Sequence, residues 1–318
     1  MIRFSVIPPA MSVLCLLAFA DASIGQAPAV APTWSVGEVV VQVDNARRHS
    51  LIDPLSPESP WETRLVLDPS DDIVLSDFSG SRQKKIAEGL DPVFSPDGRF
   101  VVYCGFPGLE RDLQIMVIKA DGTGRYPLTK IAGAPCAPDW SPDGTRIALN
   151  STSNRGPVVM VLDLVKASIL AIARGTFPRW SPDGKKLLFI QTPGADGAPY
   201  AISIANPDGT DTRKIVDIRA QVPAASWGPD GASIVYTEDD HHRSAIFRGN
   251  LDGTNPEKIA GDNGLEMYFP SLSLDGKELV VVTGEQGSQM LQLIDLDTHK
   301  VHTLSAGSRG EVRWIKSH

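Results

Sequence analysis

The sequence predicts an all-β protein, a six-bladed β-propeller, and three observations point to it. Glycine and proline are frequent, with 28 and 25 of the 318 residues, which favours many turns and few long helices. One sequence unit recurs five times at spacings of about 40 to 47 residues, the length of one four-stranded propeller blade. Each copy also joins two short apolar segments through the same kind of turn, as an antiparallel hairpin requires.

The repeated unit ends in the turn Ser-Pro-Asp-Gly or a close variant of it. Proline sets φ at the second turn position, aspartate is tolerated at the third, and glycine supplies the positive φ at which the chain re-enters a strand. Because an aspartate recurs at one position of this turn, we predict a structural role shared by all blades rather than a metal site. These aspartates are Asp97, Asp143, Asp183, Asp230 and Asp275.

A second hairpin follows in each repeat. Residues 114–118 form an apolar strand that turns at Asp121-Gly122, and the same Asp-Gly pair returns at 208–209 and 252–253; Asp-Gly between apolar segments is a strong hairpin signal. Four tryptophans occupy one position of the repeat, where a large flat ring is expected to pack between neighbouring blades rather than to bind a ligand by stacking. They are Trp140, Trp180, Trp227 and Trp314.

The two ends of the chain predict how the ring closes. Residues 311–315 look like the start of a repeat, and residues 63–67 and 73–76 look like strands that lack an inner strand. Pairing of the C-terminal strand with the N-terminal blade leaves no open edge and gives six blades. Seven blades are the alternative, because residues 53–57 resemble a degraded repeat start and residues 38–43 would then share the closing blade.

The N-terminal segment is predicted to be a targeting sequence rather than part of the fold. A positive start, an apolar run at residues 11–20 and small residues after it are typical of a secretory signal peptide. We therefore divide the chain into a signal peptide (1–22), an N-terminal arm (23–59) and the propeller (60–318), with periplasmic localisation and no membrane span after signal cleavage. An oxidising compartment permits a disulfide between Cys104 and Cys136, but two free buried thiols fit the sequence equally well.

The charge balance excludes one class of partner. The chain carries 30 Lys and Arg residues against 38 Asp and Glu residues, for a net charge of -8. A nucleic-acid binder needs a basic face to neutralise phosphates, and an anionic membrane surface attracts basic segments rather than acidic ones. We therefore expect no nucleic-acid partner and no attachment to a membrane surface.

These repeats resemble those of the TolB-type propellers, which are distantly related to WD-type repeats. The resemblance rests on Ser-Pro-Asp-Gly, an apolar strand and Ile-x-Val-x-x-Ala-Asp-Gly-Thr, matched best by residues 95–129, and covers roughly residues 60–318. It implies a non-catalytic protein-protein interaction module of the Tol-Pal envelope system, which receives the lipoprotein Pal or a similar envelope protein at the mouth of the ring. TolB carries an α/β domain before its propeller, and residues 23–59 are too few to supply one.

The sequence offers no recognised catalytic motif. It has no Gly-x-Ser-x-Gly elbow, no His-Glu-x-x-His helix and no pair of Cys-x-x-Cys sites. The acidic and histidine-rich segment 238–243 falls where a hairpin should turn, so a solvated loop is the expected structure. We predict no enzymatic activity, no cofactor and no metal. The alternative is a propeller enzyme, or a carbohydrate or small-molecule binder, with a metal in the central tunnel.

The candidate site follows from the positions where the repeats differ. Residues just before and within the inner strands should line one mouth of the tunnel, and charged groups there can position a partner and select against wrong ones. We therefore expect a monomer that binds a protein partner through this mouth. The predicted residues are Asp91, Asp139, Arg179, Ser271, Glu311 and Arg313, with Ser226 at an equivalent position.

Overall fold

The computed structural model describes the part of the chain that carries the repeats. The predicted signal peptide, the N-terminal arm and residues 311–315 lie outside the described residues. No described residue is helical, and within this part there is accordingly no helix with the length and apolar character needed to cross a bilayer. The described residues are 64–67, 72–77, 83–108, 113–131, 133–153, 156–193, 199–220, 223–240, 243–261, 266–284 and 290–306.

The strands form five four-stranded antiparallel sheets, here called blades 1 to 5, and a three-stranded N-terminal sheet. The N-terminal sheet comprises β1 (Arg64–Leu67), β2 (Asp72–Asp77) and β3 (Gln83–Glu88). Blade 1 comprises β4 (Leu90–Phe94), β5 (Phe100–Gly105), β6 (Gln114–Lys119) and β7 (Tyr126–Pro127). Blade 2 comprises β8 (Cys136–Trp140), β9 (Arg146–Ser153), β10 (Gly156–Asp163) and β11 (Ser168–Arg174).

Blades 3 to 5 repeat this order of strands. Blade 3 comprises β12 (Thr176–Trp180), β13 (Leu187–Gln191), β14 (Tyr200–Ala205) and β15 (Arg213–Ile218). Blade 4 comprises β16 (Ala225–Trp227), β17 (Ser233–Asp240), β18 (Arg243–Asn250) and β19 (Glu257–Ala260). Blade 5 comprises β20 (Met267–Leu272), β21 (Glu278–Thr283), β22 (Met290–Asp295) and β23 (Val301–Ala306).

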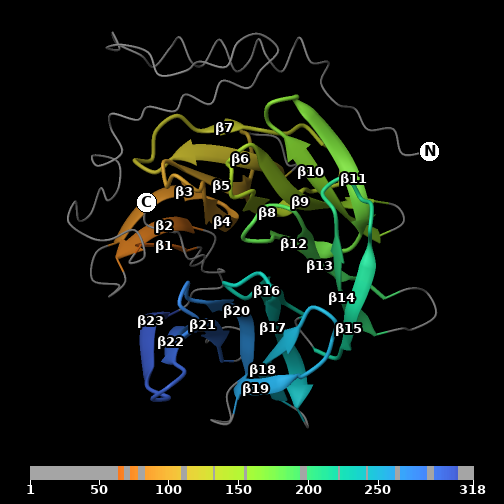
Figure 1. Cartoon of the computed structure of the whole chain (residues 1–318). Helices are drawn as coiled ribbons and strands as arrows, with labels where there is room; N and C mark the ends of the chain where they lie inside the picture. The colour runs from red at the N-terminus through yellow and green to blue at the C-terminus, as the bar shows by residue number, and fades with distance from the viewer. Residues whose placement is uncertain are drawn as a thin grey trace.

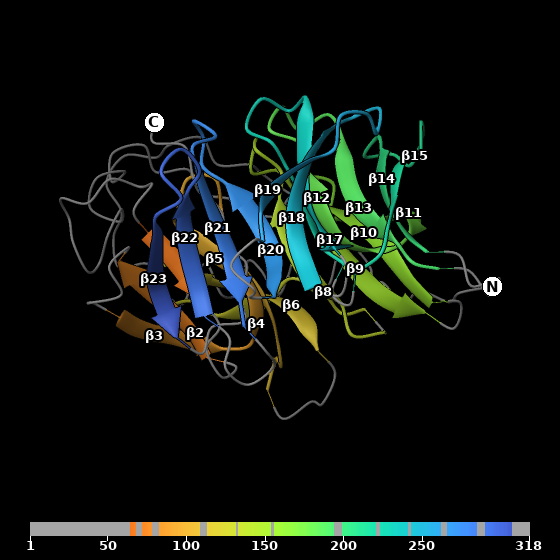
Figure 2. The same cartoon turned by 90° about the horizontal axis from the view of Figure 1, so that it is seen from below.

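The blades are arranged around a central tunnel in chain order. The colours of Figure 1 run around the ring from the orange N-terminal sheet through yellow and green to the blue blade 5, which returns to the side where the ring begins. The first strand of each blade is the inner one and contacts the first strand of the next blade. Figure 2, turned by 90°, shows the strands of blade 5 running between the two ends of the ring. An all-β propeller is therefore the fold.

The Ser-Pro-Asp-Gly turn is held by the same hydrogen bonds in four of the five blades. The serine hydroxyl donates to the aspartate carboxylate over 2.5 to 2.7 Å, and the amide two residues after the aspartate donates to the same oxygen. Blade 4 has Gly228 in place of this serine, and Ser233 donates to Asp230 instead. The structural role predicted for the repeated aspartates is confirmed.

The hydrophobic core lies between the blades. Trp180 of blade 3 packs with Ala148 and Val161 of blade 2 and with Leu187 of its own blade, and the guanidinium of Arg146 lies 4.4 Å from the centre of its indole ring. A cation over an aromatic face adds electrostatic attraction to the apolar contact. The prediction that tryptophans pack between neighbouring blades is confirmed for the described ones.

The inner strands of four blades carry a β-bulge just before their proline. The register of pairing shifts at this point in β4, β8, β12 and β20, and the residue before each proline has a φ of 50° to 52°. Blade 4 has no such shift and its short inner strand begins after the corresponding point. A bulge leaves one residue unpaired and re-aims its side chain. The bulge residues are Asp91, Ala137, Phe177 and Phe269.

The N-terminal sheet packs directly against blade 1. Ile73 and Leu75 of β2 share a buried cluster with Tyr103 and Met116 of blade 1. The strands predicted at residues 63–67 and 73–76 are thus present as β1 and β2, and β1 offers the edge beside which an inner strand would lie. The expected closing strand 311–315, and the segments 38–43 and 53–57 on which the seven-bladed alternative depends, lie outside the described residues.

Candidate functional site

A cavity of about 390 Å³ opens at the end of the tunnel where the repeated turns lie. All five blades contribute to its walls. The lining consists of the last residues of each inner strand and the first residues of each turn: Val93, Phe94, Ser95, Pro96, Asp139, Trp140, Pro142, Trp180, Ser181, Pro182, Ser226, Trp227, Gly228, Pro229, Ser271, Leu272 and Leu274. We call this the turn-end cavity.

The rim of the turn-end cavity is a ring of prolines. In blades 2 to 5 the turn glycine lies beside the proline of the preceding blade, and a Cβ built on Gly184 would fall 3.4 Å from Pro142. A side chain at that glycine would therefore press on the neighbouring turn. Blade 5 breaks the ring, because Leu274 stands where the other turns have proline and is 39% exposed. The rim is thus apolar and presents one large side chain to solvent.

The polar groups of the turn-end cavity also join blades. Asp139, 5% exposed, accepts a hydrogen bond of 2.7 Å at its carboxylate from the backbone amide of Trp180 in the next blade. Ser226 donates to the carbonyl of Pro270 over 2.7 Å. These side chains hold successive inner strands together while lining the cavity.

At the opposite end of the tunnel, which we call the bulge end, two aromatic side chains meet. The rings of Phe177 and Phe269 meet edge to face with centroids 6.0 Å apart. They belong to the bulges of blades 3 and 5, so their contact spans the place where blade 4 has no bulge. An edge-to-face pair at this distance is an attractive arrangement, and it places a hydrophobic contact across this end of the tunnel.

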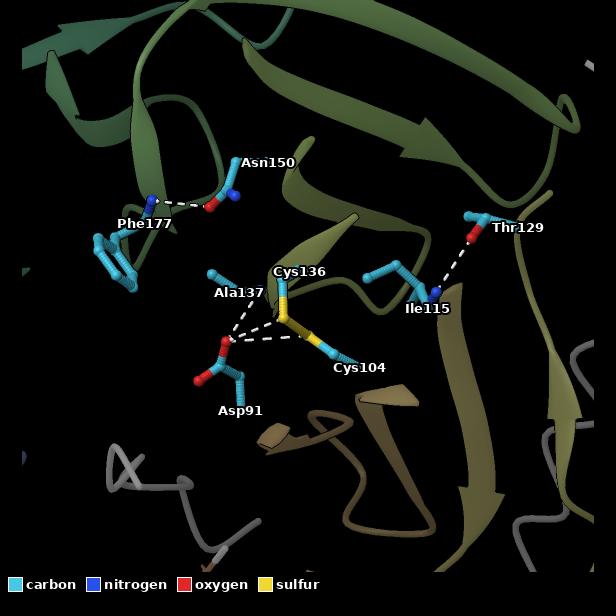
Figure 3. Close-up of a disulfide and its surroundings, with 8 residues drawn as sticks. All are labelled: Asp91, Cys104, Ile115, Thr129, Cys136, Ala137, Asn150 and Phe177. Atoms are coloured by element: carbon cyan, nitrogen blue, oxygen red, sulfur yellow. Dashed lines mark hydrogen bonds between the residues drawn. A yellow bond between two sulfur atoms is a disulfide. The ribbon is translucent and has the colours of Figure 1, made fainter. Parts of the chain in front are cut away.

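The bulge end also holds a disulfide. Cys104 of β5 and Cys136 of β8 are joined, with their Cα atoms 5.2 Å apart, which resolves the alternative that the sequence left open. Figure 3 shows the carboxylate of Asp91 pointing at this pair: its Oδ2 lies 3.3 Å from Cys136 Sγ and 3.8 Å from Cys104 Sγ, and accepts a hydrogen bond of 3.2 Å from the amide of Ala137. Burial raises the pKa of Asp91, although Arg179 and that amide act to lower it.

The family of this chain is identified by its match to a family model. Residues 111–313 match the family model described as the TolB beta propeller domain, which is more than half of the sequence. The chain belongs to the TolB propeller family.

Relatives of this TolB-like propeller include proteins named as peptidases and proteins named as Tol-Pal system components. It is 33% identical over 202 residues to the uncharacterized peptidase YuxL of Bacillus subtilis, covering 56% of this chain and 28% of the relative. It is 29% identical over 103 residues to the Tol-Pal system protein TolB of Alcanivorax borkumensis, covering 32% of this chain and 24% of the relative. The chain thus matches only about a quarter of the length of each of these relatives.

The fold is shared with a solved TolB. The crystal structure of TolB from Acinetobacter baumannii superposes with a TM-score of 0.62 at 20% identity, over 79% of this chain and 64% of that one. Identity this low shows a common architecture. The resemblance inferred from the repeats is confirmed by the family match and by this structure.

The structure places the sequence-predicted site residues at two separate locations. Asp139 and Ser271, with Ser226, line the turn-end cavity. Asp91 lies at the bulge end, because it occupies the bulge position that Ala137 holds in blade 2, two residues before the position of Asp139. Glu311 and Arg313 lie outside the described residues.

Arg179 is 3% exposed and lies between the inner strands. Its Nη1 donates to the carbonyl of Pro178, and its own carbonyl accepts the indole N–H of Trp227 over 3.0 Å. The side chain is therefore buried rather than solvated at a rim, and its charge acts on the carboxyl of Asp91 in blade 1.

Sequence reasoning missed the apolar part of the turn-end cavity. A signal was present, since Leu274 replaces the proline that the other turns share. The predicted site was built from charged positions that differ between the repeats. A leucine in place of a repeated proline is an equally specific difference between the repeats. A hairpin joins β17 and β18 where it was expected, but the solvated loop predicted for residues 238–243 is wrong for most of the segment, because the strand pairing continues to Asp240 and Arg243. Only residues 241–242 are left between the strands, and they lie outside the described residues.

Proposed function

We propose that this protein is a non-catalytic interaction module of a Tol-Pal-like envelope system, and that it receives a protein partner at the turn-end cavity. The observation that carries the proposal is the cavity itself, about 390 Å³ with walls from all five blades and an apolar rim. Pockets that enclose a small molecule have volumes of roughly 300 to 1,000 Å³, so this cavity has room for only a few side chains of a larger partner.

The chemistry of the lining supports binding rather than catalysis. Catalysis requires several ionisable groups that converge on one point. Among the described residues that line the turn-end cavity, Asp139 is the one ionisable side chain, and its carboxylate accepts a hydrogen bond from the Trp180 amide. Buried apolar anchors within an apolar rim are instead typical of the centre of a protein-protein interface.

The cellular location and the partner follow from the relatives as part of this proposal. Relatives named as Tol-Pal system protein TolB support an envelope location, which for an exported chain is the periplasm. The partner we propose is an envelope lipoprotein similar to Pal. The propeller is proposed to be six-bladed, with residues 311–315 pairing beside β1 to complete the N-terminal sheet, which leaves Glu311 and Arg313 near the inner strands.

The test is a binding assay between the mature chain and the soluble domain of a Pal-like lipoprotein from the same organism. Leu274→Glu places a charge on the rim of the turn-end cavity, and we expect it to weaken binding at least tenfold. Leu170→Glu is the matched control, because Leu170 is 48% exposed on the outer strand β11, and it should bind as the wild type does. Equal binding by both variants would place the partner elsewhere, and no binding by the wild type would reject this class of partner.

A further inference from the structure

We propose that Asp91, Cys104 and Cys136 form a binding site for a soft divalent cation such as Zn²⁺ when the disulfide is reduced. The three side chains bring one carboxylate oxygen and two sulfur atoms within 4.8 Å of one another. Two thiolates and a carboxylate are donors that zinc accepts, and three protein ligands with water in the fourth position is a known zinc arrangement. The site lies at the bulge end, so it is independent of the proposed partner cavity.

The position of the Asp91 carboxylate carries the inference. Its Oδ2 lies 3.3 and 3.8 Å from the two sulfur atoms (Figure 3). A tetrahedral zinc bound to sulfur at about 2.3 Å and to oxygen at about 2.0–2.2 Å holds the two atoms about 3.5 Å apart. The carboxylate therefore already stands where a metal-bound oxygen would stand. Reduction allows the sulfur atoms to separate and to face the same point.

The contact between blades 2 and 3 shows how the same place in the repeat is built when it carries no cysteine pair. There Asn150 accepts the bulge amide of Phe177 through its Oδ1 over 3.1 Å (Figure 3). Cys104 occupies the position of Asn150 in blade 1, since each pairs with the residue before the bulge, and Asp91 takes over the bulge amide of Ala137. A neutral amide is thus replaced by a thiol and a carboxylate at the same joint, a departure from the repeat that brings in metal-binding atoms.

The oxidised and metal-bound forms are related by a balanced exchange. A dithiol reductant gives two electrons and two protons to the Cys104–Cys136 bond, which breaks to two thiols while the reductant closes to its own disulfide. A divalent cation then displaces one proton from each thiol, and both protons go to solvent. Cys104 is fully buried, whereas Asp91 and Cys136 are only partly buried, so a cation would approach from the side of Asp91 and Cys136.

The experiment compares cobalt binding by the oxidised and the reduced full mature chain without air. We expect one equivalent of Co²⁺ per reduced chain, with a thiolate-to-cobalt charge-transfer band and tetrahedral d–d bands, displaced by one equivalent of Zn²⁺, and no such bands for the oxidised chain. Asp91→Asn should weaken the affinity at least tenfold, whereas Asp217→Asn, an exposed carboxylate on β15, should leave it unchanged.

Three results would overturn the proposal: a reduced chain that gives no thiolate-to-cobalt band, an oxidised chain that binds as the reduced one does, or an Asp91→Asn variant with wild-type affinity. The reduced chain with both thiols alkylated serves as a second blank that involves no substitution. Circular dichroism of each form verifies that the sheets are intact during the titration.

Discussion

The carboxylate of Asp139 in blade 2 accepts the backbone amide of Trp180 in blade 3, over 2.7 Å. Together with the hydrogen bond from the Phe177 amide to Asn150, this bond joins two blades whose inner strands are side by side but belong to different sheets. A buried backbone amide that loses its acceptor costs the full desolvation of the group. The candidate binding residue is therefore also part of the framework of the ring.

We predict that Asp139→Ala lowers the free energy of unfolding by about 1.5–3 kcal/mol, the range for a lost hydrogen bond to a charged group. Asp139→Asn keeps an acceptor oxygen and should cost less. Asp217→Ala removes an exposed carboxylate and should stay within about 0.5 kcal/mol of the wild type. Urea denaturation measures all three, and an alanine variant as stable as the control would contradict the assigned role of this bond.

The turn aspartates of blades 3 and 5, Asp183 and Asp275, should make stability depend on pH. The Ser181 hydroxyl and the Lys185 amide lower the pKa of Asp183, and the Ser273 hydroxyl and the Lys277 amide lower the pKa of Asp275. A carboxyl whose folded pKa lies below its unfolded pKa stabilises the protein above the unfolded value of about 3.9. That stability is lost as the pH falls through the folded pKa.

We therefore expect the melting temperature to fall as the pH decreases below about 4, and to be flat with respect to these groups above about 5. Ser181→Ala removes one of the donors and should reduce the size of the fall, whereas Ser168→Ala, at an exposed position on β11, should leave the profile unchanged. Melting curves recorded by circular dichroism from pH 3 to pH 7 decide this, and identical profiles for both variants would refute it.

The fold was predictable because the turn chemistry is local. Ser95 and Asp97 bond to each other within the same turn, so the sequence of the turn determines its hydrogen bonds without reference to the rest of the chain. The repeat length then fixes one blade per copy. The Cys104–Cys136 bond was left open because it joins neighbouring blades, and the distance between two blades is set by packing along their whole length.

The candidate site was only partly predictable, because the bulge changes the direction in which successive side chains of the inner strand point. Asp91 and Asp139 both stand next to the proline of their inner strand, one before and one after it. The bulge between those positions sends Asp91 to the disulfide and Asp139 to the turn-end cavity. Two charges that look equivalent in the repeat thus serve different ends of the tunnel.

The disulfide should contribute strongly to stability. It closes a loop of 32 residues between blades 1 and 2, and the loss of chain entropy in the unfolded state corresponds to about 3–4 kcal/mol. We expect reduction to lower the free energy of unfolding in guanidinium chloride by this amount, measured with a chelator present to exclude metals. A Cys104→Ser/Cys136→Ser variant is the control, and reductant should have no effect on it. A change below about 1 kcal/mol in the wild type would contradict the prediction.

The contact between Phe177 and Phe269 should couple blades 3 and 5 energetically. Their rings are 6.0 Å apart, and aromatic pairs of this geometry contribute about 0.5–1.5 kcal/mol beyond the burial of their surface. In a double-mutant cycle we expect Phe177→Ala and Phe269→Ala to show a coupling of this size. Phe177→Ala combined with Phe106→Ala, where Phe106 is 47% exposed, should be additive within about 0.5 kcal/mol. If the Phe177 and Phe269 substitutions were as additive as those in the control cycle, the predicted coupling between blades 3 and 5 through these rings would be wrong.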